Sequence, residues 1–227
     1  MDERCRLTHA KLLAGTCPWC GQPIIKGQPP FPAAVPSSSA ISLKELVARS
    51  GPLDCGTTAR IIEQVAQQLQ QMHGSGNVHR DLRPDCIFVD ETGKAKLTTS
   101  LAAPLDTGAS YNSSDAQEAA LSCADFLAPE QVIGSQLPDT RSDIYSLGCT
   151  MYFLLTARPP FPTGSVSERL LNHQTTKPPA IQSLRSDVPI ALAAICEKMM
   201  EKKPIERFQL ASDVADAITV WRVESDG

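Results

Sequence analysis

The sequence has no excess of positive charge, no long hydrophobic run and no apolar stretch after its first residues. Its 21 Lys and Arg residues stand against 25 Asp and Glu residues, a formal net charge of -4. Nucleic-acid-binding domains are typically basic or carry a basic stripe, so this class is excluded. No run reaches the roughly 20 apolar residues of a transmembrane helix, so no membrane contact is expected. The first residues, Met1-Asp2-Glu3-Arg4, are not followed by the apolar region of a signal peptide, which predicts a cytoplasmic location.

The eight cysteines do not have the even distribution of a disulfide framework in a small secreted protein. Three of them crowd the first twenty residues and are considered below. The other five are scattered singly through segments with the composition of a core: Cys55, Cys86, Cys123, Cys149 and Cys196. Single cysteines in such segments behave as small hydrophobic residues, so we expect these five to be buried and reduced.

Three regions differ in composition. Residues 1–25 are rich in Cys, and residues 26–40 form a Pro- and Ser-rich linker without apolar periodicity. Residues 41–222 alternate long helical patterns with short strand patterns, which predicts a mainly α fold with a small β hairpin. The predicted helices lie at about 42–50, 57–73, 143–156, 165–175, 189–201 and 210–222, the hairpin strands at 86–90 and 95–99, and a surface loop at 102–124.

Two of the predicted helices have informative patterns. The helix at 57–73 is amphipathic, and Thr57 or Thr58 is suited to cap its start. Its apolar stripe consists of Ile61, Ile62, Val65, Leu69 and Met72. The helix at 143–156 is apolar nearly all round, which is typical of a helix buried on most of its sides.

A short motif, His79-Arg80-Asp81-Leu82-Arg83-Pro84, lies between the amphipathic helix and the hairpin. It is followed in order by Ala128-Pro129-Glu130 and by Asp143-Ile144-Tyr145-Ser146-Leu147-Gly148. The motif and this order resemble the C-terminal lobe of serine/threonine protein kinases, over about residues 41–222. The resemblance implies a protein-kinase-like lobe built on the catalytic loop at 79–86.

The resemblance also implies a role for particular residues. Asp81 corresponds to the catalytic base that accepts the proton of the substrate hydroxyl, and Arg83 stands where the family has a Lys that steadies the transferred phosphoryl group. The other implied roles are structural: His79 and Arg80 packed against the central helix, Asp143 accepting backbone donors from the catalytic loop, and Glu130 paired with Arg207.

Three departures from the family pattern concern catalysis. Cys86 replaces an Asn that binds Mg²⁺, and Thr99-Ser100-Leu101 replaces the Asp-Phe-Gly whose Asp holds the metal. A thiol is a poor ligand for Mg²⁺, and a neutral hydroxyl does not replace a carboxylate. Cys123 replaces a Thr that bonds the catalytic Asp. ATP and Mg²⁺ are the cofactors of the family, but these replacements predict that the chain does not use them.

The family's N-terminal lobe, which covers the nucleotide, is not recognisable in this sequence. There is no Gly-x-Gly-x-x-Gly motif, and the 40 residues before the lobe resemble a Cys-rich segment and a linker. We therefore expect that lobe to be absent. Phe88, Ile87 and Val89, which would lie beneath the nucleotide in a two-lobed kinase, would then face water. We predict self-association or a protein partner at this exposed upper face.

The Cys-rich segment contains Cys17-Pro18-Trp19-Cys20-Gly21, a spacing that is common in zinc knuckles. Cys5 and His9 can complete a tetrahedral site with Cys17 and Cys20, so a zinc-ribbon-like segment is predicted. A redox Cys-x-x-Cys motif and an unliganded tail are the alternatives, although a redox motif is usually found in a βαβ context that is missing here.

Three functions remain open from the sequence. The first is a pseudokinase that binds or scaffolds protein partners without transferring phosphate. The second is a divergent active serine/threonine kinase that uses Asp81 as its base and borrows an N-terminal lobe from another polypeptide. The third is a decayed gene product. Loss of both metal ligands favours the first, because phosphoryl transfer depends on charge neutralisation and positioning.

Overall fold

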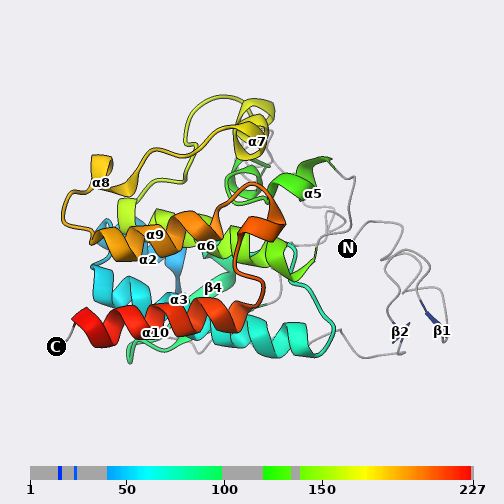
Figure 1. Ribbon diagram of the computed structural model, residues 1–227, viewed down its shortest axis with the longest axis horizontal. Coiled ribbons are helices and arrows are strands. Elements are labelled where there is room, and N and C mark those ends of the chain that lie inside the picture. The colour runs from blue at the N-terminus through cyan, green and yellow to red at the C-terminus, as the bar shows by residue number, and fades with distance from the viewer. Residues whose placement is uncertain (1–14, 17–22, 25–39, 99–119, 134–138, 226–227) are drawn as a thin grey trace. The chain divides into compact units, whose positions relative to one another are not determined.

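The structure is a computed structural model that describes residues 15–16, 23–24, 40–98, 120–133 and 139–225 (Figure 1). It divides into two compact units, Met1–Val35 and Pro36–Gly227. In the first unit, β1 (Gly15–Thr16) pairs antiparallel with β2 (Pro23–Ile24). The four predicted zinc ligands, Cys5, His9, Cys17 and Cys20, lie outside the described residues.

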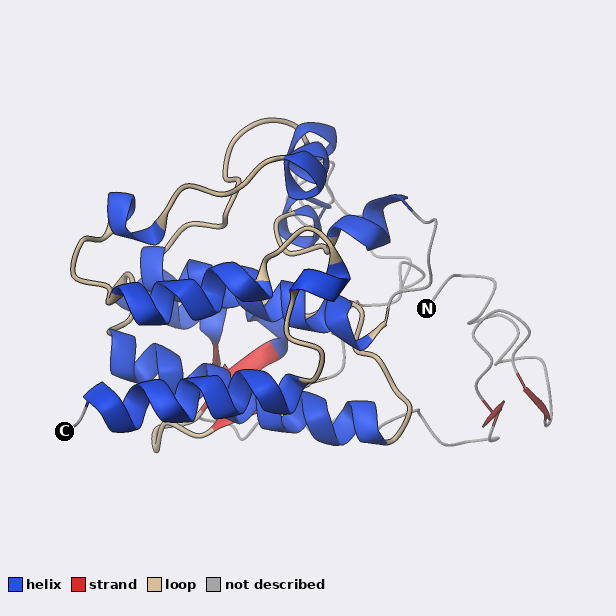
Figure 2. Cartoon of the chain, in the orientation of Figure 1, coloured by secondary structure: helices blue, strands red, loops and turns tan. Residues whose placement is uncertain are grey.

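The second unit is mainly helical, with one small sheet, as predicted (Figure 2). Its described α-helices are α2 (Leu43–Ser50), α3 (Cys55–Gly74), α5 (Pro129–Ile133), α6 (Thr140–Thr156), α7 (Val166–Thr175), α8 (Ile181–Leu184), α9 (Ile190–Met199) and α10 (Ala211–Ser225). Two 3-10 turns, η1 (Pro84–Cys86) and η2 (Pro204–Glu206), connect them. The short helices α5 and α8 were not predicted, because four or five residues give no measurable apolar period.

Helix α6 is the centre of the hydrophobic core. It packs against α3 on one side and α9 on another, and α10 runs along α3 (Figure 1). Its residues Ile144, Leu147, Met151 and Leu154 are all fully buried, which confirms the prediction of a helix buried nearly all round. The helix begins at Thr140, three residues before the predicted start, because the Asp139 carboxylate caps it by accepting a hydrogen bond from the Arg141 amide.

Helix α3 buries the predicted stripe except for Met72, which is half-buried, and it begins earlier than predicted. The prediction that Thr57 or Thr58 caps it was wrong: the helix starts at Cys55, and Asp54 is the N-cap. The Asp54 Oδ1 accepts a 2.8 Å hydrogen bond from the Thr57 amide. A carboxylate at this position satisfies an amide that has no partner within the helix, which makes Asp54 the better cap.

The sheet has three strands, one more than the predicted hairpin. Its order is β3 (Ile41–Ser42), β4 (Ile87–Val89) and β5 (Ala95–Leu97), all antiparallel. The extra strand β3 pairs Ile41 with Val89. Two residues at the start of a predicted helix carry no strand pattern of their own, so this pairing could be found only in the folded structure.

The outer edge of β5 is covered by two side chains of α3. The amide of Gln68 donates to the Ala95 carbonyl at 2.9 Å and accepts from the Leu97 amide at 3.0 Å. Gln64 accepts from the Ala95 amide at 2.9 Å and donates to the Gly93 carbonyl at 3.3 Å. An exposed strand edge invites pairing with other chains, and the two glutamines occupy this edge in place of a fourth strand.

Two further predictions were wrong in part. Residues 120–124 of the predicted loop are helical, while 102–119 lie outside the described residues. Cys86, Cys149 and Cys196 are buried as predicted, but Cys55 is half-buried and Cys123 is exposed; all five are free thiols. Composition identified the core-like segments, but it could not identify which of their residues face the core.

Candidate active site

Asp143, at the start of α6, holds the loop that follows α3. Its Oδ2 accepts a 2.8 Å hydrogen bond from the His79 amide, and its Oδ1 accepts a 2.7 Å bond from the Arg80 amide. The Nε2 of His73 lies 2.8 Å from the same Oδ2. The Asp143 side chain is only 1% exposed, so its carboxylate lies in the interior, where the backbone amides of the loop supply its hydrogen bonds.

Arg80 adopts a left-handed backbone conformation with φ 69°, which is uncommon for a residue with a long side chain. Its carbonyl accepts a 2.7 Å bond from the Gln131 side chain, which also accepts from the Ala128 amide at 3.1 Å. The half-buried His79 ring contacts the Thr98 carbonyl at 2.8 Å through Nε2. Surrounding contacts therefore hold the strained loop in one conformation.

Asp81, Arg83 and Cys123 lie together at the end of this loop. The Nε of Arg83 is 3.5 Å from the Asp81 carboxylate, and its Nη1 donates to the Cys123 Sγ at 3.2 Å. Burial lowers the pKa of Arg83, but the Asp81 charge raises it, and the net result is a raised pKa. Although Cys123 as a residue is exposed, partial desolvation of its thiol raises the pKa, so the thiol is protonated at neutral pH. The structure thus keeps a carboxylate and a cation side by side.

Cys86 is fully buried in η1, and its Sγ donates to the Asp81 carbonyl at 3.4 Å. The carbonyl of Cys86 accepts from both the amide and the hydroxyl of Thr98, at 2.8 and 3.0 Å. The other predicted metal position, Thr99, lies outside the described residues. A buried sulfur directed at a backbone carbonyl does not fit Mg²⁺, which requires oxygen ligands in octahedral geometry. No group of three His, Cys, Asp or Glu side chains suited to a metal occurs among the described residues.

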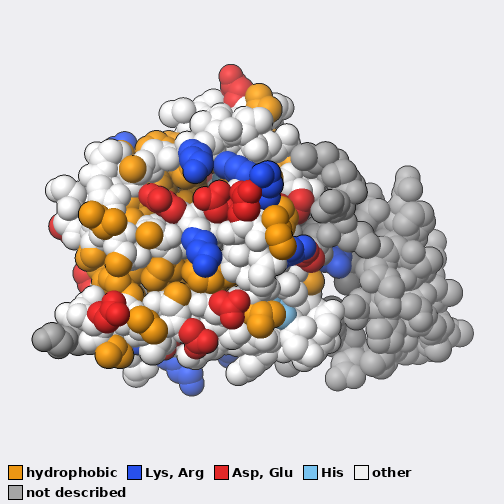
Figure 3. All heavy atoms as spheres, viewed as in Figure 1, with side chains coloured by type: hydrophobic (Ala, Val, Ile, Leu, Met, Phe, Trp, Pro, Cys, Tyr) orange, Lys and Arg blue, Asp and Glu red, His pale blue; other side chains and the backbone are white. Residues whose placement is uncertain are grey.

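The expectation that Ile87 and Val89 face water was wrong. Ile87 is fully buried and Val89 is 8% exposed, because alternate residues of β4 point into the core beneath α2 and α3. Phe88 points to the other face and is half-buried. The exposed large hydrophobic residues of the described chain lie elsewhere, several of them over α9 and α10 (Figure 3): Leu171, Leu184, Ile190, Ile205, Leu210, Val220 and Val223.

Glu130 and Arg207 connect α5 to the segment before α10. The Arg207 Nη1 and Nη2 donate to the two carboxylate oxygens of Glu130 at 2.8 and 2.9 Å, and the Ser142 hydroxyl donates at 2.7 Å. Burial raises the pKa of Glu130, but the bonds from Arg207 and Ser142 outweigh it, so the pKa lies below its ordinary value. This bidentate geometry fixes both position and charge.

Sequence reasoning missed three residues of this region. His73 and Gln131 support the loop directly, and Ser142 supports Glu130. A histidine in the last turn of the helix before the loop was a usable signal for His73. Gln131 and Ser142 have no distinguishing spacing, so the folded structure alone reveals them.

The buried helix, the loop held by Asp143 and the joined Asp81 and Arg83 define a kinase-type catalytic lobe. Residues 35–217 match the family model of the protein kinase domain, so the chain belongs to the protein kinase family.

The curated relatives are serine/threonine kinases. PknB of Mycolicibacterium smegmatis is 34% identical over 183 residues, which cover 79% of this chain and 29% of that protein. PrkC of Bacillus subtilis is 32% identical over 182 residues, 80% of this chain and 28% of that protein. A probable serine/threonine-protein kinase of Corynebacterium efficiens is 33% identical over 178 residues, 76% of this chain and 26% of that protein. The chain therefore spans less than a third of the length of these relatives. Among the described residues, no helix combines the length and apolarity needed to cross a membrane.

Proposed function

We propose that this chain is a kinase-fold binding module, a pseudokinase, that does not transfer phosphate. The observation that carries the proposal is Cys86, whose fully buried thiol stands where the family places a Mg²⁺ ligand and bonds the Asp81 carbonyl instead. Phosphoryl transfer depends on metal ions that bridge the phosphates and neutralise their charge. A catalytic loop that cannot hold the metal keeps its architecture without this chemistry.

Two replacements in the sequence support the same function. Thr99 stands in place of the second metal ligand, and a hydroxyl carries no charge to hold the ion. Cys123 replaces a Thr that bonds the catalytic Asp, and its Sγ contacts Arg83. Thr99 thus lacks the charged carboxylate of the metal position, and Cys123 lacks the hydroxyl that bonds the catalytic Asp in the family.

A divergent active kinase is the second candidate. It is favoured by the pair of Asp81 and Arg83, whose side chains remain 3.5 Å apart and partly exposed, at 31% and 13%. A base and a cation at this spacing could act on a substrate hydroxyl if another polypeptide supplied the nucleotide and its metal.

A thermal-shift titration with ATP, with and without Mg²⁺, distinguishes these candidates. A ligand at 100 times its dissociation constant stabilises the folded protein by about 2.7 kcal/mol, a readily measured shift. The pseudokinase proposal expects the same melting temperature at millimolar Mg·ATP as with EDTA and ATP. A rise in melting temperature that requires Mg²⁺ would favour the active kinase.

Residues 1–25 form a separate zinc site in this proposal, with Cys5, His9, Cys17 and Cys20 as ligands. β1 pairs with β2, and the sequence between them carries Cys17 and Cys20 at the Cys-x-x-Cys spacing that is common in zinc knuckles. Elemental analysis of chain purified without chelator should give about one zinc per chain. Cys17→Ser should lose the zinc, whereas Cys123→Ser should keep it. A zinc-free wild-type chain would disprove the site.

A further inference from the structure

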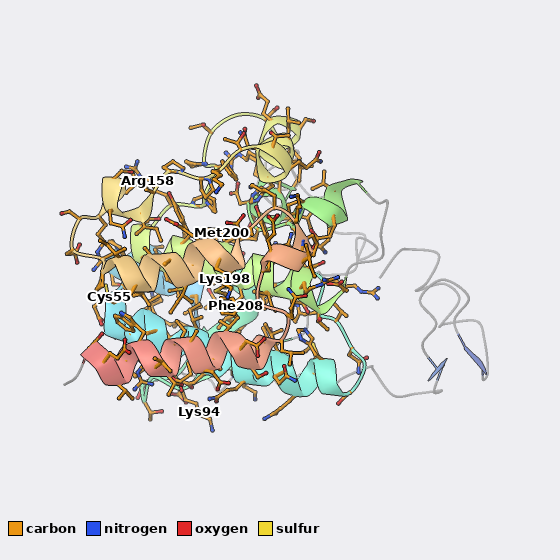
Figure 4. All side chains as sticks on the ribbon, in the orientation of Figure 1. Cys55, Lys94, Arg158, Lys198, Met200 and Phe208 are labelled. Carbon is orange, nitrogen blue, oxygen red and sulfur yellow. The ribbon has the colours of Figure 1, made fainter. Side chains whose placement is uncertain are left out.

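A groove of about 630 Å³ lies between α3 and the β4–β5 hairpin. One wall consists of four glutamines of α3, and the opposite wall carries Lys94 and Lys96. The ring of Phe88 contributes the largest apolar part of the lining, beside Ala40 and Ala95, and Asp90 also lines the groove. Lys94 extends outward from the helices at the lower edge of the view in Figure 4. The groove is separate from the pair of Asp81 and Arg83.

Two of the four glutamines already form hydrogen bonds with an extended backbone. Gln64 and Gln68 bond alternate residues of β5, Ala95 and Leu97, at 2.9 to 3.0 Å. The match is geometric, because residues four apart on a helix rise ~6 Å and residues two apart on a strand advance ~6.8 Å. A pair of glutamines spaced by four residues is therefore a template for one extended strand.

Gln67 and Gln71 repeat this spacing on the neighbouring stripe of α3. Both are exposed and line the groove. Within the described part of the chain, their side-chain amides make no hydrogen bond, whereas those of Gln64 and Gln68 bond β5, the Gly93 carbonyl before it and, for Gln68, the Gln64 carbonyl as well. The groove thus presents a second glutamine pair that is available to the backbone of an incoming strand.

The charges on the opposite wall indicate which side chains that strand should carry. Lys94 and Lys96 are exposed, and neither makes a salt bridge with another described residue. The nearby Asp90 is occupied by its own turn: its Oδ1 accepts from the Thr92 amide and hydroxyl and from the Lys94 amide, at 2.9, 2.6 and 3.1 Å. The exposed ammonium groups of Lys94 and Lys96, of which Lys94 also interacts with the charge of Asp90, lie beside an aromatic ring and match acidic side chains that flank an apolar one.

We propose that this groove binds an extended segment of a partner protein in which acidic residues flank an apolar residue. Its backbone bonds Gln67 and Gln71, its apolar side chain packs on Phe88, and its carboxylates face Lys94 and Lys96. The chain's own residues 26–40 contain no acidic residue and so lack this complementarity. The inference names a partner class for the binding function proposed above. Its test uses neither nucleotide nor Asp81, so the two can fail separately.

The test is fluorescence anisotropy with the full chain and a labelled synthetic peptide of alternating Glu and Val with one central Phe. The matched control peptide has Lys in place of every Glu. The acidic peptide should bind saturably, and the basic one should bind at least about tenfold more weakly, a difference of ~1.4 kcal/mol. Added salt should weaken the acidic peptide, because exposed charges are screened.

Three variants locate the site. Lys94→Glu with Lys96→Glu, and separately Gln67→Ala with Gln71→Ala, should each weaken binding about tenfold at an unchanged urea midpoint. Lys177→Glu, an 84% exposed lysine that lines a different cavity, should have no effect. Equal binding of the two peptides, no saturable binding, or an equal loss in Lys177→Glu would overturn the proposal. A dimer in sedimentation that Lys94→Glu with Lys96→Glu disperses would assign the groove to a second copy instead.

Discussion

Arg207 uses all five of its N–H donors, and two of them hold Glu130. The other three donate to the carbonyls of Arg141, Glu201 and Lys202 at 2.9, 2.7 and 3.0 Å. The Arg207 side chain is 0% exposed and that of Glu130 is 10% exposed. An arginine with no unused donor joins α5, α6 and the segment before α10 at a single point.

Removing either partner of this pair should destabilise the lobe strongly. Glu130→Ala leaves a buried guanidinium unpaired, at an expected cost of roughly 3–5 kcal/mol. Arg207→Ala should cost at least as much, because it also leaves the three carbonyls unpaired. In urea titrations, the double variant should cost little more than the worse single one.

The matched control for this pair is Glu206→Ala, which breaks the exposed pair with Lys203. An exposed ion pair contributes at most about 1 kcal/mol. If Glu130→Ala costs no more than Glu206→Ala, the buried pair does not stabilise the fold.

The stability of the lobe should fall as pH drops from about 6.5 to about 4. Burial, and then the charge of Lys202, lower the pKa of His173 from 6.5 to about 4. Between pH 6.5 and 4, His173 is therefore protonated in the unfolded chain but neutral in the folded chain, so acid favours unfolding. The effect is on the order of 3 kcal/mol, fully present above pH 6.5 and lost as pH falls toward 4.

The check is the unfolding free energy across this pH range for wild type and His173→Gln. The variant has no imidazole to titrate, so its stability should vary less with pH between 4 and 6.5, whatever its absolute value. An unchanged slope would assign the pH dependence to other groups.

Gly148 should tolerate no side chain, whereas Gly74 should. A Cβ added at Gly148 would lie 2.8 Å from both the Met199 Cβ and the Met200 Cγ, where α6 packs against α9. Gly148→Ala should therefore cost about 1–3 kcal/mol through overpacking. At Gly74, in the last turn of α3, nothing lies within 4 Å of the added Cβ. Gly74→Ala should change stability by less than about 1 kcal/mol. Equal effects of the two substitutions in thermal unfolding would contradict this packing.

Gln68→Leu should loosen the hairpin locally. The substitution keeps the size of the side chain but leaves the Leu97 amide and the Ala95 carbonyl without their partner. A buried backbone group without a partner costs about 1–3 kcal/mol. Hydrogen exchange should therefore speed up at the Leu97 amide more than at the Val65 amide in the core of α3. Unchanged exchange at Leu97 would show that water replaces the glutamine without loss.

Some contacts between residues distant in the sequence could be predicted, because recognisable motifs contain those residues. The helix at 143–156, buried nearly all round, followed from its apolar pattern. The contacts of Asp143 and Glu130 were expected only because the motifs around them resemble those of the kinase family. The cap at Asp54 and strand β3 were not predictable, because they depend on two or three residues whose local signals compete with stronger neighbours.

The candidate binding surfaces were less predictable than the core. Phe88 is half-buried, but Ile87 and Val89 were not recognised as buried, although strand alternation places them on the opposite face. The role of Gln64 and Gln68 was missed because polar residues on an amphipathic helix are ordinarily solvated. The edge of β5 beside them gives each of them partners that the helix pattern does not reveal.

The central claim is that the lobe keeps the kinase fold without phosphoryl transfer. Its most direct test is incorporation of label from radiolabelled ATP, at millimolar Mg²⁺ or Mn²⁺, into the chain and into a generic protein substrate. Wild type and Asp81→Asn are compared, with urea midpoints to show that both are folded. The account predicts the same background signal for both proteins, since Cys86 offers no metal ligand. Incorporation by wild type that Asp81→Asn abolishes would contradict it and establish an active kinase.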